Sequence, residues 1–226
     1  MLKVLLQEAR KILSSSVSPW WLLLVLPFLL ALPFDQFALD HGRFADNTPA
    51  HKAAEFISQR GDFYNATFAL VALLFVLGSA LKRKNLRALA LAILFSCAVA
   101  GLTSLAIRIT VGRPRPSLGV PDGLYGLVFT KKEVRVPFVK NKVSLTLPDY
   151  DYESLPSGHA TTAFATAVPA LIMMPAIGIP LTVAAVGVSW ARFELNRHRL
   201  TDLYLGLIFG SVFGIIFGRA AKKTVA

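Results

Sequence analysis

The chain has 226 residues, 54% of them hydrophobic and 16% charged, and its mean hydropathy is +0.57, a balance that argues against an ordinary soluble domain and indicates a membrane protein. The formal net charge of +11 is spread over short segments between apolar runs and not along one soluble face, so no nucleic-acid partner is expected. The single cysteine, Cys97, excludes an intrachain disulfide and a cysteine-rich zinc site.

The N-terminal residues 1–17 carry apolar side chains at helical spacing and basic ones around the rest of the turn. This pattern predicts an amphipathic helix that lies at the membrane interface. The first apolar run follows at about 20–33 and contains Pro27. A cleaved signal peptide is the alternative, but the basic leader is long and no A-x-A site follows the apolar stretch.

Further apolar runs approach the length of a membrane span, since a helix rising 1.5 Å per residue needs about 20 residues to cross about 30 Å of hydrocarbon. The sequence therefore predicts an all-α fold in one domain, residues 1–226, built as a six-transmembrane helical bundle. A short amphipathic helix is also expected at about 50–59. The six predicted spans are at about 20–33, 64–81, 88–107, 160–177, 179–193 and 203–217.

The basic residues predict the orientation of the bundle. Short cytoplasmic loops are enriched in Lys and Arg, so the 82–87 loop and the basic tail around 219–223 are expected inside, together with the N-terminus. The long loop from 108 to 159 then lies on the non-cytoplasmic side. It contains a possible strand at 142–147.

Polar residues gather at the predicted non-cytoplasmic ends of the spans, where charged groups are costly and therefore call for an explanation. By the six-span count all of them emerge on one side and can share one site. The three clusters are Arg108, Arg113, Pro114, Arg115 and Pro116; Pro156, Ser157, Gly158 and His159; and Arg192, His198 and Asp202.

Arginines from separate elements can cradle a phosphate, because each guanidinium offers a planar fork of donors. Ser157 and Gly158 precede an apolar helix, whose free N–H groups and dipole also favour an anion. The alternative for any one of these residues is that the arginine reaches the headgroups and the serine caps the helix. Arg113 has the position to reach a second phosphate or a headgroup.

Two histidines and an aspartate fit the remaining roles in phosphoester cleavage. His198 and Asp202 are four residues apart, so on a helical turn the carboxylate can bond one ring nitrogen and leave the other to attack phosphorus. His159 is then the general acid that protonates the leaving alkoxide.

A metal site is the competing explanation, and it requires carboxylates or histidines at ligand spacing. The acidic residues near the motifs are Asp149, Asp151 and Glu153, which are interpreted as a solvated loop. We therefore expect no metal and no cofactor, with the arginines stabilising the charge of the transition state.

The three motifs resemble the type 2 phosphatidic acid phosphatase superfamily, the membrane relatives of the vanadium haloperoxidases. Its signatures, K-x6-R-P, P-S-G-H and S-R-x5-H-x3-D, correspond to residues 108–116, 156–159 and 191–202. Two positions depart from the pattern: Arg108 replaces a lysine and Ala191 replaces a serine. The resemblance covers the chain from about the second predicted span onward.

The resemblance implies a role for each matched residue. His198 is the nucleophile that forms a phosphohistidine, Asp202 orients it, and His159 is the general acid that later activates water. The residues implied to hold the phosphoryl oxygens are Arg108, Arg115, Arg192, Ser157 and the backbone of Gly158.

The implied function is a metal-independent lipid phosphatase of a bacterial inner membrane, with its site facing the periplasm or exterior. Its partners are the bilayer and a lipid phosphate such as lipid A, polyprenyl diphosphate, phosphatidylglycerol phosphate or phosphatidic acid. A lipid-to-lipid phosphotransferase using the same residues is an alternative, and a non-enzymatic lipid transporter is another.

Overall fold

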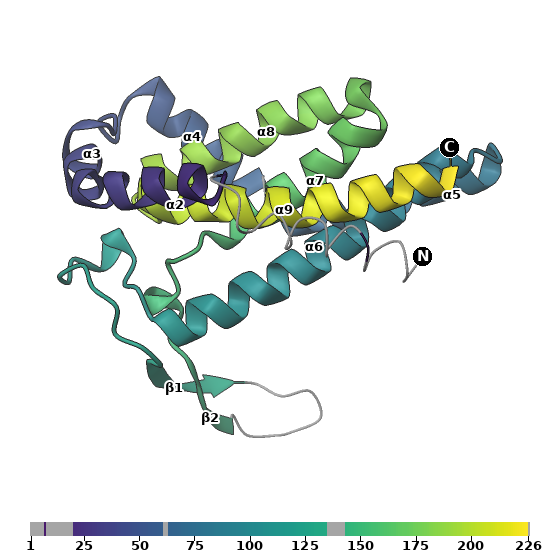
Figure 1. Ribbon diagram of the computed structural model, residues 1–226. Helices are drawn as coiled ribbons and strands as arrows, with labels where there is room; N and C mark the ends of the chain where they lie inside the picture. Colours follow the sequence, from purple (N-terminus) through teal and green to yellow (C-terminus); the bar gives the residue numbers. More distant parts are fainter. Residues whose placement is uncertain (1–6, 8–19, 61–62, 135–142, 226) are drawn as a thin grey trace.

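The computed structural model describes residues 20–60, 63–134 and 143–225, together with Gln7. This part of the chain is mostly helical, with one small antiparallel sheet (Figure 1). The predicted helical character is therefore confirmed. The elements are α2 (Trp20–Ala31), α3 (Asp35–His41), α4 (Pro49–Arg60), α5 (Phe63–Ala80), α6 (Lys84–Val111), β1 (Phe129–Val134), β2 (Val143–Pro148), α7 (Gly158–Met173), α8 (Pro175–Glu194) and α9 (Leu200–Val225), with 3-10 turns η2 (Leu32–Phe34), η3 (Pro116–Leu118) and η4 (Tyr150–Tyr152).

The centre of the bundle is formed by α7, which packs against α9, α8 and α6. Glycines recur every fourth residue along α9 at positions 206, 210, 214 and 218, and all of them face α7. A Cβ atom at Gly210 would lie 2.4 Å from the carbonyl oxygen of Thr161, so only a hydrogen atom fits there. Small residues at this spacing let two helix backbones approach closely in a membrane protein. We call these four positions the glycine seam.

The basic loop and the basic tail lie at the same end of the bundle, where the α5–α6 turn meets the C-terminus (Figure 1). Lys84 and Arg87 line one cavity together with Thr224. The Lys222 ammonium donates to the carbonyl oxygen of Ile172 near the end of α7, over 3.1 Å. The segments with the three polar clusters gather at the opposite end. The side of the membrane on which each end lies stays a prediction.

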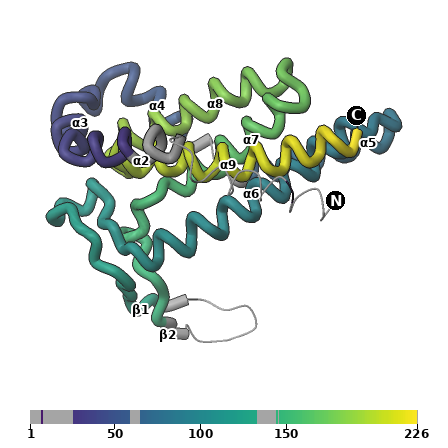
Figure 2. Tube along the Cα trace, in the orientation of Figure 1, coloured from purple at the N-terminus to yellow at the C-terminus, as the bar shows by residue number. Residues whose placement is uncertain are grey.

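The N-terminal helices cover the end of the bundle that holds the polar clusters (Figure 2). Helix α4 packs against α8, while α2 and α3 contact α9. The short helix expected at 50–59 is confirmed as α4. The structure also contains α3, which was not predicted.

Within the described residues, three helical segments are long and apolar enough to cross a membrane. They are 84–118, which contains α6, together with α8 and α9, and a shorter apolar helix spans Asn65–Ala80. The six-span arrangement stays a prediction. The amphipathic helix expected at 1–17 lies outside the described residues except for Gln7.

Helices α7 and α8 follow each other with one residue between them. The chain turns at Met174, and Pro175 is the first residue of α8, where its missing N–H leaves no hydrogen bond unmade. Pro180 lies inside α8, in its second turn.

Helix α6 extends beyond the predicted span, so Arg108 lies in its last turn and not in the following loop. The helix ends because Gly112 adopts a left-handed conformation with φ 60°, and the Gly112 N–H donates to the Arg108 carbonyl oxygen over 3.0 Å. A Cβ at Gly112 would lie 1.9 Å from the carbonyl oxygen of Gly126, which restricts the position to glycine.

The strand expected at 142–147 is present as β2, shifted by one residue. It pairs antiparallel with β1, which was not predicted, and Lys131 lies opposite Thr146 in the register. The strands therefore close part of the long loop between α6 and α7 into a hairpin-like arm beside the bundle (Figure 1).

Candidate active site

His198 lies in the short connection between α8 and α9, and its side chain is buried. The chain reverses there because Asn196 adopts a positive φ of 56°. The N–H groups of Arg197 and His198 both donate to the carbonyl oxygen of Arg192, over 3.0 and 3.3 Å. This tight turn fixes the backbone of the third motif.

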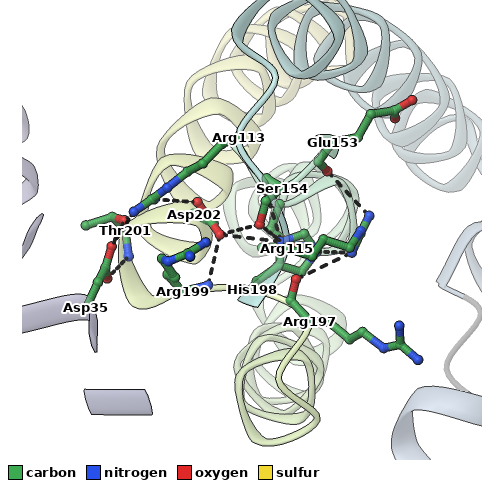
Figure 3. Close-up of polar contacts among 12 residues, drawn as sticks. Asp35, Arg113, Arg115, Glu153, Ser154, Arg197, His198, Arg199, Thr201 and Asp202 are labelled. Carbon is green, nitrogen blue, oxygen red and sulfur yellow. Dashed lines mark hydrogen bonds and ion pairs between the residues drawn. The ribbon is translucent and has the colours of Figure 1, made fainter. Parts of the chain in front are cut away.

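The hydrogen bonds of His198 define its tautomer. Nδ1 lies 3.0 Å from the carbonyl oxygen of Ser154. Because a carbonyl oxygen only accepts, Nδ1 carries the proton and Nε2 keeps its lone pair. Nε2 lies 3.4 Å from Nη1 of Arg115, which places the unprotonated nitrogen beside a guanidinium (Figure 3).

Asp202 lies in the first turn of α9, and its carboxylate accepts hydrogen bonds from other groups besides lying near His198. Its Oδ2 is 3.8 Å from Nδ1 of His198, an ion-pair distance, while the Ser154 hydroxyl donates to the same oxygen over 2.6 Å. The backbone N–H of Arg199 also donates to Oδ2, over 2.9 Å. The expected helical-turn geometry does not apply, because His198 precedes α9. Ser154 therefore supplies the nearest acceptor to Nδ1, and nothing in the sequence around it signals that role.

Arg115 is 2% exposed and held by backbone carbonyl groups. Its Nε donates to the Tyr150 oxygen over 3.0 Å, its Nη2 to the Glu153 oxygen over 3.4 Å, and its Nη1 to the Arg197 oxygen over 3.5 Å. The guanidinium carbon also lies 3.9 Å from the centre of the Tyr150 ring. These contacts fix a positive charge next to the Nε2 atom of His198.

The segment from Asp149 to Glu153, expected to be a solvated loop, contains the 3-10 turn η4, and the Asp149 carboxylate accepts from the N–H of Asp151 at the start of that turn. Its carbonyl groups bind Arg115. Among the described residues, no group of three or more His, Cys, Asp and Glu side chains is arranged to hold a metal ion.

Ser157 joins the second motif to the third, since its backbone N–H donates to the Asp202 carbonyl oxygen over 2.9 Å. Its hydroxyl accepts from the N–H of Ala160 over 3.5 Å and caps α7, which begins at Gly158. The helix-capping alternative is therefore part of this residue's role. The first turn of α7 is held beside the first turn of α9.

His159 is affected by its burial and by the positive charges of the first and third motifs. Burial is the main cause that lowers the pKa of His159 to about 3, followed by the positive charges of Arg192, His198, Arg115 and Arg108. Arg192 is itself buried, and its Nη1 donates to the Ser58 hydroxyl of α4 over 2.9 Å. The three motifs thus meet in one electropositive region, as the side assignment required.

The pKa of His198 is also low, at about 4, chiefly because the ring is buried. The Asp202 carboxylate acts in the opposite direction, and the Arg115 charge adds to the decrease. Both histidines are therefore neutral at neutral pH. A neutral His198 suits attack through Nε2, whereas His159 needs a proton to act as an acid.

Binding of a dianion is expected to be accompanied by proton uptake at His159. Negative charge stabilises the imidazolium and raises its pKa from the value of about 3 in the free protein. The affinity for the anion therefore increases as the pH falls. Calorimetric titration of tungstate in two buffers of different ionisation enthalpy at pH 7 measures the uptake. His159→Gln is expected to abolish it, and equal uptake by the variant and the unaltered protein would contradict the assignment.

The position of Arg113 in the sequence suggested that it could reach a second phosphate or a headgroup. In the structure its side chain instead contacts three carboxylates. Its Nη2 lies 3.0 Å from Asp35 and 2.6 Å from Asp122, and its Nη1 lies 2.8 Å from Oδ1 of Asp202 (Figure 3). Nη1 also donates to the Thr201 hydroxyl, which in turn donates to Asp35. Arg113 is 2% exposed and its charge is compensated within the protein. Arg113 thus binds Oδ1 of Asp202, while Oδ2 is the oxygen near His198.

Comparisons with known proteins identify the family of the chain. A sequence model of the PAP2 superfamily matches residues 89–225, a range that contains all three motifs. The chain is 24% identical over 122 residues to the lipid A 1-phosphatase of Rhizobium johnstonii, a match that covers 54% of this chain and 43% of that relative. The chain thus covers less than half of the relative's length. No solved structure matches.

Proposed function

The chain belongs to the PAP2 superfamily, and on this basis we propose that it removes phosphate from a membrane lipid through a phosphohistidine on Nε2 of His198. The observation that carries the proposal is the tautomer of His198. Its Nδ1 proton is held by the Ser154 carbonyl oxygen, and its Nε2 lone pair faces the buried guanidinium of Arg115. A phosphoryl group bound to that guanidinium lies next to the nucleophile.

The proposed reaction has two displacements at phosphorus. Nε2 of His198 attacks, the bond from phosphorus to the lipid oxygen breaks, and His159 gives its proton to the leaving alkoxide. Water then attacks the phosphohistidine, His159 accepts a proton from that water, and the N–P bond breaks to release phosphate. The arginines at positions 108, 115 and 192 stabilise the negative charge of both transition states.

The basic residues support a site on the non-cytoplasmic face. The end of the bundle with Lys84, Arg87 and Lys222 lies opposite the candidate site. Because cytoplasmic ends carry the excess of Lys and Arg, the site then faces the periplasm or the exterior of a bacterial inner membrane.

An apolar groove between α5 and α6 supports a substrate with a hydrocarbon chain. It has a volume of about 420 Å³ and follows α6 from Leu94 to Arg108. Arg108 closes the end of the groove near the site, and its buried Nε has no hydrogen-bond partner in the described part of the chain. We define this as the chain groove. A lipid tail in the groove places its phosphate next to Arg108.

Filling the chain groove is expected to act on long-chain lipids in particular. Gly101 lines the groove, and a Cβ built there meets no atom within 4 Å, so Gly101→Leu starts a side chain in the groove without a clash at its Cβ. We expect kcat/KM for a long-chain lipid phosphate to fall about 10-fold relative to that for p-nitrophenyl phosphate, which matches the lost burial of roughly two methylene groups.

Gly187→Leu on α8 is the matched control, since a Cβ at Gly187 also meets no atom within 4 Å and Gly187 does not line the groove. An equal fall for both substrates in Gly101→Leu, or the same selectivity in both variants, would contradict this role for the groove.

The natural lipid is proposed from a short series: lipid A, polyprenyl diphosphate, phosphatidylglycerol phosphate and phosphatidic acid. The similarity to a lipid A 1-phosphatase supports the first of these. The test is phosphate release by the purified full chain from each lipid in the presence of a chelator. Loss of turnover in chelator would overturn the metal-independent mechanism, and absence of phosphate release from every lipid would overturn the function.

Transfer of the phosphoryl group to a second lipid is the alternative that uses the same residues. Labelled donor lipid, incubated with and without an acceptor lipid, separates the two reactions. Label in the acceptor indicates phosphotransfer, and label in free phosphate indicates hydrolysis.

A further inference from the structure

A second pocket lies beside the candidate active site, and its chemistry is opposite to that of the chain groove. It has a volume of about 420 Å³ and a mainly polar lining. Such a volume lies within the range of about 300–1,000 Å³ that is usual for small-ligand pockets. Its lining residues are Glu55, Ser58, Tyr150, Arg192, Leu195 and Arg197. We call it the α4 pocket, because α4 supplies Glu55 and Ser58.

The α4 pocket borders the proposed phosphate-binding region through two residues. Arg192 belongs to the third motif, and its Nη1 donates to the Ser58 hydroxyl over 2.9 Å. The ring of Tyr150, which contacts the Arg115 guanidinium at 3.9 Å, is 45% exposed and lines the pocket. A group attached to a phosphate at Arg115 and Arg192 therefore extends into this pocket.

The lining offers donors and acceptors together. Glu55 is exposed and presents a carboxylate, which accepts hydrogen bonds. Arg197 is exposed, and its guanidinium points away from the network around Asp202 (Figure 3). Because Ser58 accepts a hydrogen bond from Arg192, its own O–H remains a donor. Tyr150 adds an apolar ring with a polar tip.

We propose that the α4 pocket binds a hydroxyl-rich group attached to the substrate phosphate, namely a glycosyl unit. Each sugar hydroxyl both donates and accepts, so it pairs with Glu55 as well as with Arg197. A second phosphate is disfavoured because it meets the Glu55 carboxylate, and an esterified glycerol has no hydroxyl to offer. This inference rests on the proposed phosphatase function and names the part of the substrate that selects it.

The α4 wall of the pocket lies outside the part of the chain that matches the superfamily. The match covers residues 89–225, whereas Glu55 and Ser58 precede it. The motif residues supply the reaction, and the α4 residues supply the preference for one kind of headgroup.

The test compares two lipids with one variant. Lipid A carries its phosphate on a sugar, whereas phosphatidic acid carries it on a diacylated glycerol. We expect Glu55→Ala to lower the ratio of kcat/KM for lipid A to kcat/KM for phosphatidic acid by about 10-fold or more, the usual effect of losing a hydrogen bond to a charged group. Glu55→Gln, which keeps an acceptor, is expected to restore part of the ratio.

Lys52→Ala is the matched control, because Lys52 is an exposed charged residue of α4 that does not line the pocket. Its ratio is expected to equal that of the unaltered protein. Inhibition by vanadate, which has no headgroup, is expected to be the same in Glu55→Ala and in the unaltered protein.

The outcomes separate this inference from the function on which it rests. If the unaltered protein releases phosphate from both lipids and Glu55→Ala leaves the ratio unchanged, the glycosyl assignment is wrong and the phosphatase function stands. If the unaltered protein releases phosphate from neither lipid, the glycosyl assignment is overturned, and the phosphatase function falls with it only if the other two lipids of the series also release none. A fall in the ratio that also occurs in Lys52→Ala would assign the effect to the surface charge of α4 and overturn the pocket.

Discussion

Replacing His198 by alanine is expected to reduce lipid phosphate release by about 10⁴-fold or more, the scale of effect seen when a covalent nucleophile is removed. The imidazole is buried, its Nδ1 is bound to the Ser154 carbonyl oxygen, and its Nε2 lies 3.4 Å from Arg115. Without it no phosphoenzyme is expected to form. The measurement is turnover of each lipid by purified protein, together with acid-labile, alkali-stable labelling of the protein from a labelled donor.

His41→Ala is the control for that variant. His41 is an exposed histidine at the end of α3, and its Nδ1 contacts the carbonyl oxygen of Phe37 in its own helix. Its removal is expected to leave both turnover and labelling intact. Unchanged turnover in His198→Ala would overturn the nucleophile, whereas absence of turnover in the unaltered protein would favour the non-enzymatic lipid transporter.

Replacing Arg113 by methionine is expected to lower the free energy of unfolding by about 3–5 kcal/mol, the usual cost of removing one partner from a buried ion pair. The change leaves the carboxylates of Asp35 and Asp202 buried without their shared cation. Adding Asp35→Asn to Arg113→Met is expected to recover part of the loss, because one of the uncompensated charges is removed. Denaturant unfolding in mixed micelles measures each variant.

Arg197→Met is the matched control for stability, since Arg197 is also an arginine near His198 but is exposed. We expect its free energy of unfolding to change by no more than about 0.5 kcal/mol. Equal stability of Arg113→Met and Arg197→Met would show that the buried network does not stabilise the fold.

The motif residues could be predicted to share one site because their types and spacing carry chemistry that is visible in the sequence. His198 of the third motif meets Arg115 of the first, and Ser157 of the second motif is hydrogen-bonded to the backbone of Asp202. Ser154 and Asp35 could not be predicted. Ser154 acts partly through a backbone carbonyl group, which every residue has, and Asp35 reaches Arg113 only through the tertiary fold.

The helices were predictable as apolar runs, but their ends were not. Hydropathy reports the length of a run, whereas the end of a helix depends on local backbone conformation. Helix α6 continues to Val111 until Gly112 adopts its positive φ, and this adds the turn that carries Arg108. Helix α3 is short and covers the site end of α9, so it has no long apolar run to reveal it.

The glycine seam lies deep in the bundle, and its first position packs against Ser157 of the candidate site. The carbonyl oxygen of Ser157 lies 2.7 Å from where a Cβ of Gly206 would stand, and the Ser157 N–H is bonded to the Asp202 carbonyl oxygen. A methyl group at any position of the seam is expected to push α9 away from α7. Because both helices are stiff, their N-terminal ends, which hold Asp202 and Ser157, are expected to shift as well. Substitutions in the glycine seam, including those far from the candidate site, are therefore expected to slow the proposed chemical step while leaving the outer walls of the binding pockets in place.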